Sequence, residues 1–266
     1  MRAVAVIPAR YASTRFPGKP LAPLLGRPMI AWVIAAASRA RSLSGVYVAT
    51  DDEGIAEAAR AAGAEAVLTS PDCASGSDRV AEAARSVEAD VYVNLQGDEP
   101  LADPADVDAL VAVFGGPHPP EMATLAQPFA PDAASDLWNP DVVKVVCAAA
   151  GDALYFSRAP IPHYRDAWPR GCGEPPAPGA HVAPLRHLGV YAYTRRALSE
   201  FGELPRGRLE QAESLEQLRA LEAGWTIRVV RAVGESLGVD RPEDLPRAEA
   251  ALRRRQARED ARAPGR

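Results

Sequence analysis

Three cations stand close together in one loop near the N-terminus. Arg10, Arg15 and Lys19 lie in the segment IPARYASTRFPGKP, interleaved with the hydroxyl residues Ser13 and Thr14. Arginine can bind two phosphate oxygens at once through its planar guanidinium, whereas lysine acts as a mobile point charge. A solvated basic loop would explain any one of these residues. The whole cluster favours the binding of a polyphosphate.

A second loop, TSPDCASGSDR, combines serines with a glycine and an arginine. Ser75 or Ser77 can cap the helix that follows, and Asp78 suits its first turn because of the helix dipole. Capping explains the serines, but it does not explain Gly76, which permits close approach to the backbone, or the charge of Arg79. The N–H groups of a helix N-terminus can also bind an anion or the edge of a base. Capping and ligand binding are therefore compatible here.

Two carboxylates are candidates for a metal site beside the phosphates. Asp98 follows an apolar run and a glycine in NLQGDEP, and Asp240 precedes an expected helix in GVDRPEDL. Mg²⁺ prefers carboxylate and phosphate oxygens, so the pair predicts a magnesium site. The plainer alternatives are an acidic turn for Asp98 and a helix N-cap for Asp240. The phosphate-binding patterns of P-loop kinases and of dinucleotide dehydrogenases do not occur.

Each of these loops is expected to follow a strand or precede a helix. Short apolar runs alternate with alanine-rich segments in the first half, which is typical of a parallel sheet covered on both faces. We expect strands near residues 4–7, 46–49, 66–68 and 91–95, with helices near 28–39, 53–62 and 77–85. Ligands of such sheets bind at the carboxyl ends of the strands. The fold class is therefore α/β, with a doubly wound, mostly parallel sheet.

The second half is less regular. We expect strands near residues 142–146, 153–156, 188–193 and 226–230, one amphipathic helix over 209–222, and a last helix from 242. The stretch 160–184 is rich in proline and glycine and is predicted to be an exposed loop.

The bulk composition excludes several classes of protein. The chain has 266 residues, 47% of them hydrophobic, and a formal net charge of −5, which argues against general binding of nucleic acid. The first apolar run is too short for a signal peptide or a membrane span. Cys73, Cys147 and Cys172 form no paired motif that would suggest disulfides or zinc. A cytoplasmic protein without a membrane partner is expected by elimination.

The motifs, taken in order, resemble the signature segments of 3-deoxy-manno-octulosonate cytidylyltransferases, also called CMP-Kdo synthetases. The segments are IPARYASTRFPGKPL, ATDD, SGSDRVAEA, NLQGDEP, ALYFSRAPIP, RHLGVYAY, LEQLRALEAG and GVDRPEDL, and they run from about residue 4 to 245. ATDD alone is a weak signal, but RYASTRFPGKPL, QGDEP and RHLGVYAY in that order are specific.

The resemblance implies an enzyme that joins CMP from CTP to the acid sugar Kdo and releases pyrophosphate, for lipopolysaccharide or a related glycan. It implies Mg²⁺ as cofactor, a homodimer, and a nucleotidyltransferase fold with a smaller sheet-containing insertion. On this basis the nucleotide-binding core is expected at 1–135 and 225–254, the sugar-binding and dimerisation region at 136–224, and a flexible tail at 255–266.

The resemblance also implies a role for each motif residue. The catalytic residues would be Lys19, Arg15 and Asp98, and the metal ligands Asp98 and Asp240. The nucleotide would contact Pro8, Ala9, Arg10, Ser13, Thr14, Arg15, Lys19, Ser75, Ser77, Arg79 and Gln96. The sugar would contact Gln96, Arg158, His187, Tyr191, Glu216 and Gln217.

The residue types support these roles, because a sugar acid needs a cation and polar donors. A structural role for His187 and simple solvation of the helical Glu216 and Gln217 are the competing interpretations. The sequence departs from the family at Cys73, where members often have histidine, and in the stretch 172–184.

The implied reaction needs little covalent chemistry from the protein. The anomeric hydroxyl of Kdo would attack the α-phosphorus of CTP in line, without a covalent enzyme intermediate, so that positioning and charge neutralisation dominate. The nearest rival is a cytidylyltransferase for another acid sugar, such as a sialic acid or an eight-carbon relative of Kdo. A nucleotidyltransferase for a neutral sugar phosphate would need a second phosphate site. A non-catalytic nucleotide-binding protein on the same scaffold is the rival from a different class.

Overall fold

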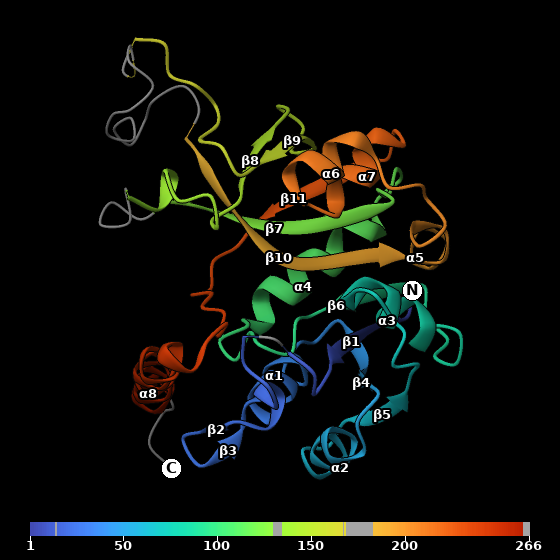
Figure 1. The fold of residues 1–266 in the computed structure, drawn as a ribbon, viewed down its shortest axis with the longest axis vertical. Helices are drawn as coiled ribbons and strands as arrows, with labels where there is room; N and C mark the ends of the chain where they lie inside the picture. The colour runs from blue at the N-terminus through green and yellow to red at the C-terminus, as the bar shows by residue number, and fades with distance from the viewer. Residues whose placement is uncertain (14, 130–134, 167, 169–182, 263–266) are drawn as a thin grey trace. The chain divides into compact units, whose positions relative to one another are not determined.

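The computed structural model describes residues 1–13, 15–129, 135–166, 168 and 183–262 (Figure 1). The chain forms two compact units. Unit 1 comprises Met1–Val111 together with Val233–Arg266, and unit 2 comprises Ala112–Ala232. Unit 2 is therefore an insertion into the sequence of unit 1.

Unit 1 is built on four parallel strands in the order β6-β1-β4-β5. These strands are β1 (Ala3–Ala9), β4 (Leu43–Thr50), β5 (Glu65–Leu68) and β6 (Val91–Asn94). Every residue of β1 is buried, as expected for a strand inside a parallel sheet that is covered on both faces. The helices α1 (Met29–Ala37), α2 (Glu53–Ala61) and α3 (Gly76–Ala83) make the crossovers between successive strands.

Local sequence signals set the starts of two of these helices. The Asp52 side chain accepts a hydrogen bond from the Ile55 N–H at the start of α2. Ser75 and Asp78 form a capping box at the start of α3, in which each side chain accepts from the other residue's N–H. Both arrangements satisfy N–H groups that have no partner within the helix.

Short elements and a terminal helix complete unit 1. The first loop contains η1 (Lys19–Leu21) and the hairpin β2 (Pro23–Leu24) and β3 (Arg27–Pro28). After β6 comes α4 (Pro104–Ala112), and the chain then enters unit 2 at η2 (Val113–Gly115). It returns to unit 1 and forms η4 (Pro242–Asp244) and α8 (Leu245–Arg262). A buried cluster joins α8 to the first loop; it includes Leu24, Met29, Leu101, Val239 and Leu252.

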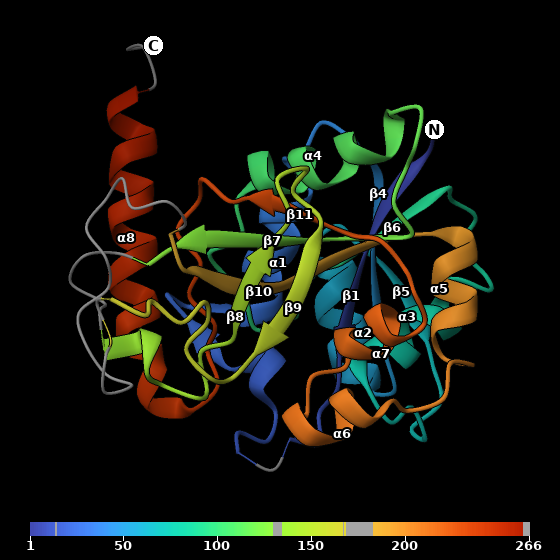
Figure 2. The ribbon, with the colours of Figure 1, turned by 90° about the horizontal axis from the view of Figure 1, so that it is seen from above.

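Unit 2 is a mixed sheet with short helices. The strands β7 (Met122–Pro128), β8 (Lys144–Cys147), β9 (Ala153–Ser157), β10 (Leu185–Thr194) and β11 (Ile227–Arg231) form it. Figure 2 shows β7 between β11, which is parallel to it, and β10, which is antiparallel. Strand β8 pairs with both β10 and β9 in antiparallel fashion. The helices are α5 (Arg195–Phe201), α6 (Arg208–Glu213) and α7 (Gln217–Glu222).

The α/β class with a mostly parallel sheet is confirmed, whereas the single helix expected over 209–222 is wrong. That segment is divided into α6 and α7 at Ser214, whose backbone is left-handed with φ 52° and ψ 47°. A left-handed residue cannot continue a right-handed helix. The observed units also differ in extent from the predicted regions. Strands β7 and β11 fall within the predicted nucleotide-binding core, but they pair in the sheet of unit 2. Helix α8 extends to Arg262, within the segment 255–266 that was predicted to be a tail.

In the part of the chain that the structure describes, no helix combines the length and the apolar character needed to cross a membrane. The stretch 169–182, which includes Cys172 and most of the proline-rich loop, lies outside the described residues, as does Thr14.

Candidate active site

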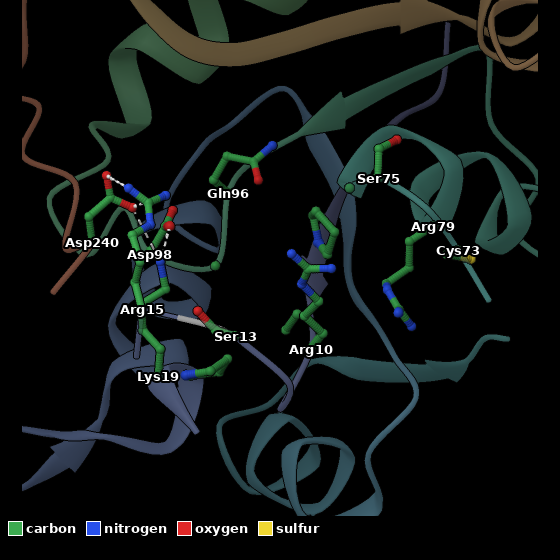
Figure 3. Close-up of a pocket in the computed structure, with 15 residues that line it drawn as sticks. Arg10, Ser13, Arg15, Lys19, Cys73, Ser75, Arg79, Gln96, Asp98 and Asp240 are labelled. Atoms are coloured by element: carbon green, nitrogen blue, oxygen red, sulfur yellow. Dashed lines mark hydrogen bonds and ion pairs between the residues drawn. The ribbon is translucent and has the colours of Figure 1, made fainter. Parts of the chain in front are cut away.

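A cavity of about 230 Å³ opens in unit 1 where the loops after β1, β5 and β6 converge (Figure 3). It is lined by Pro8, Ala9, Arg10, Ser13, Arg15, Lys19, Pro20, Cys73, Ser75, Gly76, Arg79, Gln96, Gly97, Asp98 and Asp240. The described residues predicted to bind nucleotide or metal all line this cavity except Ser77. Ser77 lies in the first turn of α3 and is 5% exposed. The cavity thus brings together the three motifs that the sequence analysis singled out.

Close packing of the backbone makes this convergence possible. A Cβ atom on Gly97 would stand 3.1 Å from the carbonyl oxygen of Pro8, closer than nearly all real Cβ contacts. The loop after β6 therefore lies directly against the end of β1. Gly97 and Pro20 had no role in the sequence analysis. The position of Gly97 immediately before Asp98, after a buried strand, is the signal that could have identified it.

Opposite charges meet at one end of the cavity. The Lys19 ammonium pairs with Asp98 and lies 3.8 Å from Asp240 Oδ1, and the Arg15 guanidinium lies 3.4 Å from the same oxygen. Figure 3 shows these four side chains converging, joined by dashed lines. The Lys19 side chain is 15% exposed, while those of Arg15 and Asp240 are more than half exposed. The two cations and two carboxylates therefore neutralise one another, and solvent reaches them from the side of Arg15 and Asp240.

A turn of the first loop holds Lys19 in place. Gly18 has a left-handed backbone with φ 69°, and its N–H donates to the Tyr11 carbonyl at 2.9 Å. This bond folds the loop back on itself immediately before η1 begins at Lys19. A side chain at position 18 would be strained in this conformation and would meet the Tyr11 ring.

Asp98 and Asp240 are far apart in sequence but are joined through the main chain. The Val239 N–H donates to the Asp98 carbonyl at 3.0 Å, and the Ser236 hydroxyl donates to Glu99 at 3.1 Å. These bonds align the returning segment of unit 1 with the loop after β6. The two predicted metal ligands are thereby placed side by side at the cavity.

A third contact fixes the start of the returning segment. The buried Asp106 carboxylate accepts from the N–H groups of Val233 and Gly234, at 2.8 and 3.1 Å. Burial raises the pKa of Asp106, and the two N–H donors oppose this rise by stabilising the charged form. Asp106 had no role in the sequence analysis. Its partners are main-chain N–H groups, which almost every residue type has, so the sequence does not indicate the contact.

The donor set at this end of the cavity fits a magnesium ion. No three His, Cys, Asp or Glu side chains among the described residues are arranged to hold a metal by themselves. Mg²⁺ does not need such a group, because it keeps several waters and binds one or two carboxylates together with substrate phosphates. Asp98 and Asp240 can supply those carboxylates once their cationic partners move away.

The opposite wall of the cavity is held by buried polar contacts. Arg79 is only 3% exposed; its guanidinium donates to the Thr69 hydroxyl at 2.6 Å and lies 3.4 Å from Asp51. The Glu82 carboxylate accepts from the Ser70 N–H at 2.9 Å. These bonds fix the segment between β5 and α3, so the wall has a defined shape before a ligand arrives.

Cys73 belongs to the same wall. Its thiol donates to Glu82 at 3.1 Å, and burial together with this bond raises the pKa of Cys73 to about 11. The thiol therefore stays protonated at neutral pH and is a weak nucleophile. Cys73 therefore presents a small neutral group at the cavity.

Gln96 projects from the loop after β6. Its amide nitrogen donates to Asn94 Oδ1 at 3.0 Å. The amide nitrogen of Asn94 is itself buried, and no hydrogen-bond partner is found for it among the described residues. The Gln96 Oε1 atom faces Gly76, 3.5 Å from where a Cβ would stand. Gln96 thus links the end of β6 to the start of α3.

The remaining predicted sugar residues lie in unit 2, where His187 and Tyr191 come together on β10. Their ring centroids are 5.4 Å apart, and the edge of the Phe156 ring also meets His187. His187 Nε2 lies 3.0 Å from the Thr124 hydroxyl. Although the ring retains some exposed surface, desolvation lowers the pKa of His187 to about 3. Burial likewise raises the pKa of Tyr191, so both groups are neutral at pH 7.

Arg158, Glu216 and Gln217 are placed differently. The Arg158 guanidinium donates to the carbonyls of Glu213, Pro140 and Ser214, at 2.6, 2.9 and 3.3 Å. Glu216 is the N-cap of α7. Gln217 follows it and is 3% exposed, and its amide nitrogen has no partner among the described residues. Gln217 is therefore not the solvated helical side chain that the competing interpretation expected.

Comparison with known proteins places the chain in a family. The family model for cytidylyltransferases matches residues 4–229. A 3-deoxy-manno-octulosonate cytidylyltransferase from Anaeromyxobacter sp. (strain Fw109-5) is 54% identical, over 95% of this chain and 98% of that relative. One from Trichlorobacter lovleyi (strain ATCC BAA-1151 / DSM 17278 / SZ) is 47% identical, over 95% of this chain and 99% of the relative.

A solved structure agrees with these relatives. The structure of CMP:2-keto-3-deoxy-manno-octonic acid synthetase complexed with CTP has a TM-score of 0.85 and is 41% identical. It covers 96% of this chain and all of that one. The resemblance inferred from the motifs is confirmed: the chain belongs to the cytidylyltransferase family and, within it, to the 3-deoxy-manno-octulosonate cytidylyltransferases.

Proposed function

We propose that this protein transfers CMP from CTP to 3-deoxy-manno-octulosonate (Kdo) and releases pyrophosphate. The observation that carries the proposal is the cluster of Lys19, Arg15, Asp98 and Asp240 at one end of the cavity. It contains both components that a nucleoside triphosphate needs, cations for phosphate oxygens and carboxylates for a metal ion.

The four charges form a set that can exchange partners. Without a ligand, Lys19 and Arg15 neutralise Asp98 and Asp240. With CTP bound, Asp98 and Asp240 would hold the metal ion, and Lys19 and Arg15 would be released to pair with the phosphates. Each side chain then keeps an opposite charge, so binding does not leave an unpaired ion in the cavity. Arg10, on the same lining, adds a further cation for the polyphosphate.

Asp98 and Asp240 would hold Mg²⁺, which when bound neutralises phosphate oxygens and helps the sugar hydroxyl to lose its proton. Lys19 and Arg15 offset the charge that builds on the leaving pyrophosphate. The cavity wall of Arg79, Ser75 and Gln96 orients the cytidine. A bond forms from the anomeric oxygen of Kdo to the α-phosphorus as the bond to the β-phosphate oxygen breaks. The protein contributes position and charge, without a covalent intermediate.

Unit 2 would supply the sugar contacts. His187 and Tyr191 are neutral polar groups that suit the hydroxyls of a sugar acid, and the buried amide of Gln217 is a donor without a partner among the described residues. Arg158 would balance the sugar carboxylate, although three carbonyls already hold its guanidinium. A homodimer and a role in lipopolysaccharide or related glycan synthesis complete the proposal and rest on the family resemblance. A cytoplasmic location rests on the classes that the composition excludes.

The test is pyrophosphate release from CTP and Mg²⁺ with Kdo, with a sialic acid, or with no sugar. We expect release with Kdo alone. Asp98→Ala should lower kcat/KM at least about 100-fold, because it removes a direct ligand of the metal rather than a group behind a ligand. Asp72→Ala is the matched control, since Asp72 is exposed and does not line the cavity.

The possible results separate the rival functions. Turnover with the sialic acid but not with Kdo would keep the chemistry and reject the substrate. Binding of CTP without turnover of any sugar would favour a nucleotide-binding protein. An Asp98→Ala variant as active as Asp72→Ala would contradict the proposed metal site.

A further inference from the structure

The C-terminal helix contacts the loop that carries Asp98. Arg255 lies on α8, and its Nη1 donates to the carbonyl oxygens of Leu101 and Ala102, at 3.2 and 2.9 Å. The Arg255 side chain is 21% exposed, whereas its neighbour Arg254 is 55% exposed. Arg255 therefore faces the protein, in the region that the sequence analysis took for a tail.

The two carbonyls stand at the end of a compact turn. The Glu99 N–H donates to the Gln96 carbonyl at 3.2 Å, and the Ala102 N–H donates to the Glu99 carbonyl at 3.1 Å. Strand β6 fixes the beginning of this turn, and Arg255 fixes its end. Asp98 lies between the two fixed points, so its position depends on both.

Packing links the same helix to the segment that carries Asp240. Leu252, one turn before Arg255, belongs to a buried cluster with Leu101, Leu237 and Val239. Val239 immediately precedes Asp240 in sequence, and Leu101 follows Asp98 by three positions. One face of α8 thus packs against both segments that bear the predicted metal ligands.

The orientation of Arg255 is itself held by an ion-pair network. Arg255 Nε donates to Glu259 at 3.2 Å, one turn further along α8. Both oxygens of the Glu259 carboxylate also accept from Arg39 at 3.0 Å, which connects α8 to the segment after α1. A planar guanidinium that is held on one edge by a carboxylate can aim its other donors in a fixed direction.

We propose that Arg255 is a positioning residue for the metal-binding pair, acting through the carbonyls of Leu101 and Ala102 to hold Asp98 beside Asp240. This inference rests on the proposed function, in which that pair binds Mg²⁺. If the end of the turn is released, its residues must be ordered again whenever the metal binds. Ordering even one residue has an entropic cost that corresponds to roughly ten-fold or more in affinity.

The test measures metal binding directly, with Mn²⁺ as the probe and electron paramagnetic resonance as the readout, on the full chain with CTP present and without Kdo. We expect Arg255→Gln to weaken Mn²⁺ binding about ten-fold and to raise the Mg²⁺ concentration needed for half-maximal turnover by a similar factor. Turnover at saturating Mg²⁺ should change much less. Arg255→Lys should be intermediate, because an ammonium can still donate to a carbonyl; it also provides the test if Arg255→Gln does not fold.

Two control variants separate positioning from general stabilisation. Arg254→Gln removes a neighbouring arginine whose partner among the described residues is the exposed Glu235, and it should leave Mn²⁺ binding unchanged. Arg39→Gln removes the ion pair between α8 and the segment after α1 but keeps the pair of Arg255 with Glu259 and the donors of Arg255 to the loop. If Arg39→Gln weakened Mn²⁺ binding as much as Arg255→Gln, docking of the helix would be the cause and the proposal would be overturned.

Asp98→Ala separates a failure of the proposed role of Arg255 from a failure of the proposed metal site. If Asp98→Ala abolishes Mn²⁺ binding while both Arg255 variants bind as the unchanged protein does, only the role of Arg255 is refuted. If Asp98→Ala binds Mn²⁺ normally, the metal site itself is refuted and the inference about Arg255 is refuted with it.

Discussion

Lys19 in unit 1 and Lys144 in unit 2 are both largely buried lysines, but their partners differ. Lys19 pairs with the carboxylates of Asp98 and Asp240. Lys144 is fully buried and donates to three main-chain carbonyls, including those of Asn139 at 3.0 Å and Val142 at 2.7 Å. Its third acceptor is the carbonyl of Arg158.

The arginines show the same contrast. Arg15 is mostly exposed and meets a side-chain carboxylate, whereas the Arg158 guanidinium donates to two carbonyls at the end of α6 and to that of Pro140 before β8. Main-chain acceptors are fixed by the fold and cannot be exchanged without unfolding it. Side-chain charges that face each other in an open cavity can exchange partners for a ligand. The difference separates cations that shape the molecule from cations that are ready to bind.

The largest effect is expected when a cation of the exchangeable kind is removed. Lys19→Met should lower kcat/KM about 1000-fold, or roughly 4 kcal/mol, because the charge on the leaving pyrophosphate loses its nearest counter-charge. The free energy of unfolding should change by less than about 1 kcal/mol, since the cavity is open to water. Steady-state kinetics and urea denaturation of the same samples measure both. A variant that loses stability instead of activity would show that Lys19 is structural.

The matched change in unit 2 should act on stability. Lys144→Met should lower the free energy of unfolding by about 3 kcal/mol, because it leaves three carbonyls in the interior without their donor. Burial lowers the pKa of Lys144, so between its folded value and 10.5 the unfolded chain binds a proton that the folded chain does not, and the unchanged protein should gain stability from this group as the pH rises. Chemical denaturation at pH 7 and pH 10 checks both points. A loss below about 1 kcal/mol would contradict the contrast.

A smaller effect should follow from the neutral His187. Its pKa is lowered from 6.5 to about 3 in the folded protein, so below pH 6.5 the unfolded chain binds a proton that the folded chain does not. Stability is therefore lost as the pH falls from about 6.5 towards 3, by at most about 1.4 kcal/mol per pH unit. His187→Gln should flatten this slope, as measured by denaturation between pH 7 and 4.5. His118→Gln, at an exposed site, should leave the slope unchanged.

The sequence predicted both the fold class and most of the residues that line the cavity. The same physical rule explains both successes. Arg10, Lys19, Asp98 and Asp240 are conspicuous by type, and the rule that ligands bind at the carboxyl ends of parallel strands gathers the first three at one edge. The residue types also carried the family resemblance, which the comparisons confirm. The roles of individual side chains stay predictions.

The sequence could not predict contacts whose other partner is the main chain. Asp106 binds N–H groups, and Arg255 and Lys144 bind carbonyls, which every residue type can provide. The break at Ser214 is of the same kind: the amphipathic pattern continues from α6 to α7, while a single left-handed residue interrupts the helix. Side-chain patterns do not record such contacts, so only the structure reveals them.

The insertion of unit 2 has a consequence for the timing of synthesis. Strands β1, β4, β5 and β6 all leave the ribosome before Val111, but Asp240 and α8 follow only after the whole of unit 2. At roughly 5–20 residues per second, this delay is on the order of ten seconds. During that interval the growing chain has a paired sheet but only half of its carboxylate pair. The apolar surface that α8 later covers is exposed, and chaperones have their best opportunity to bind there.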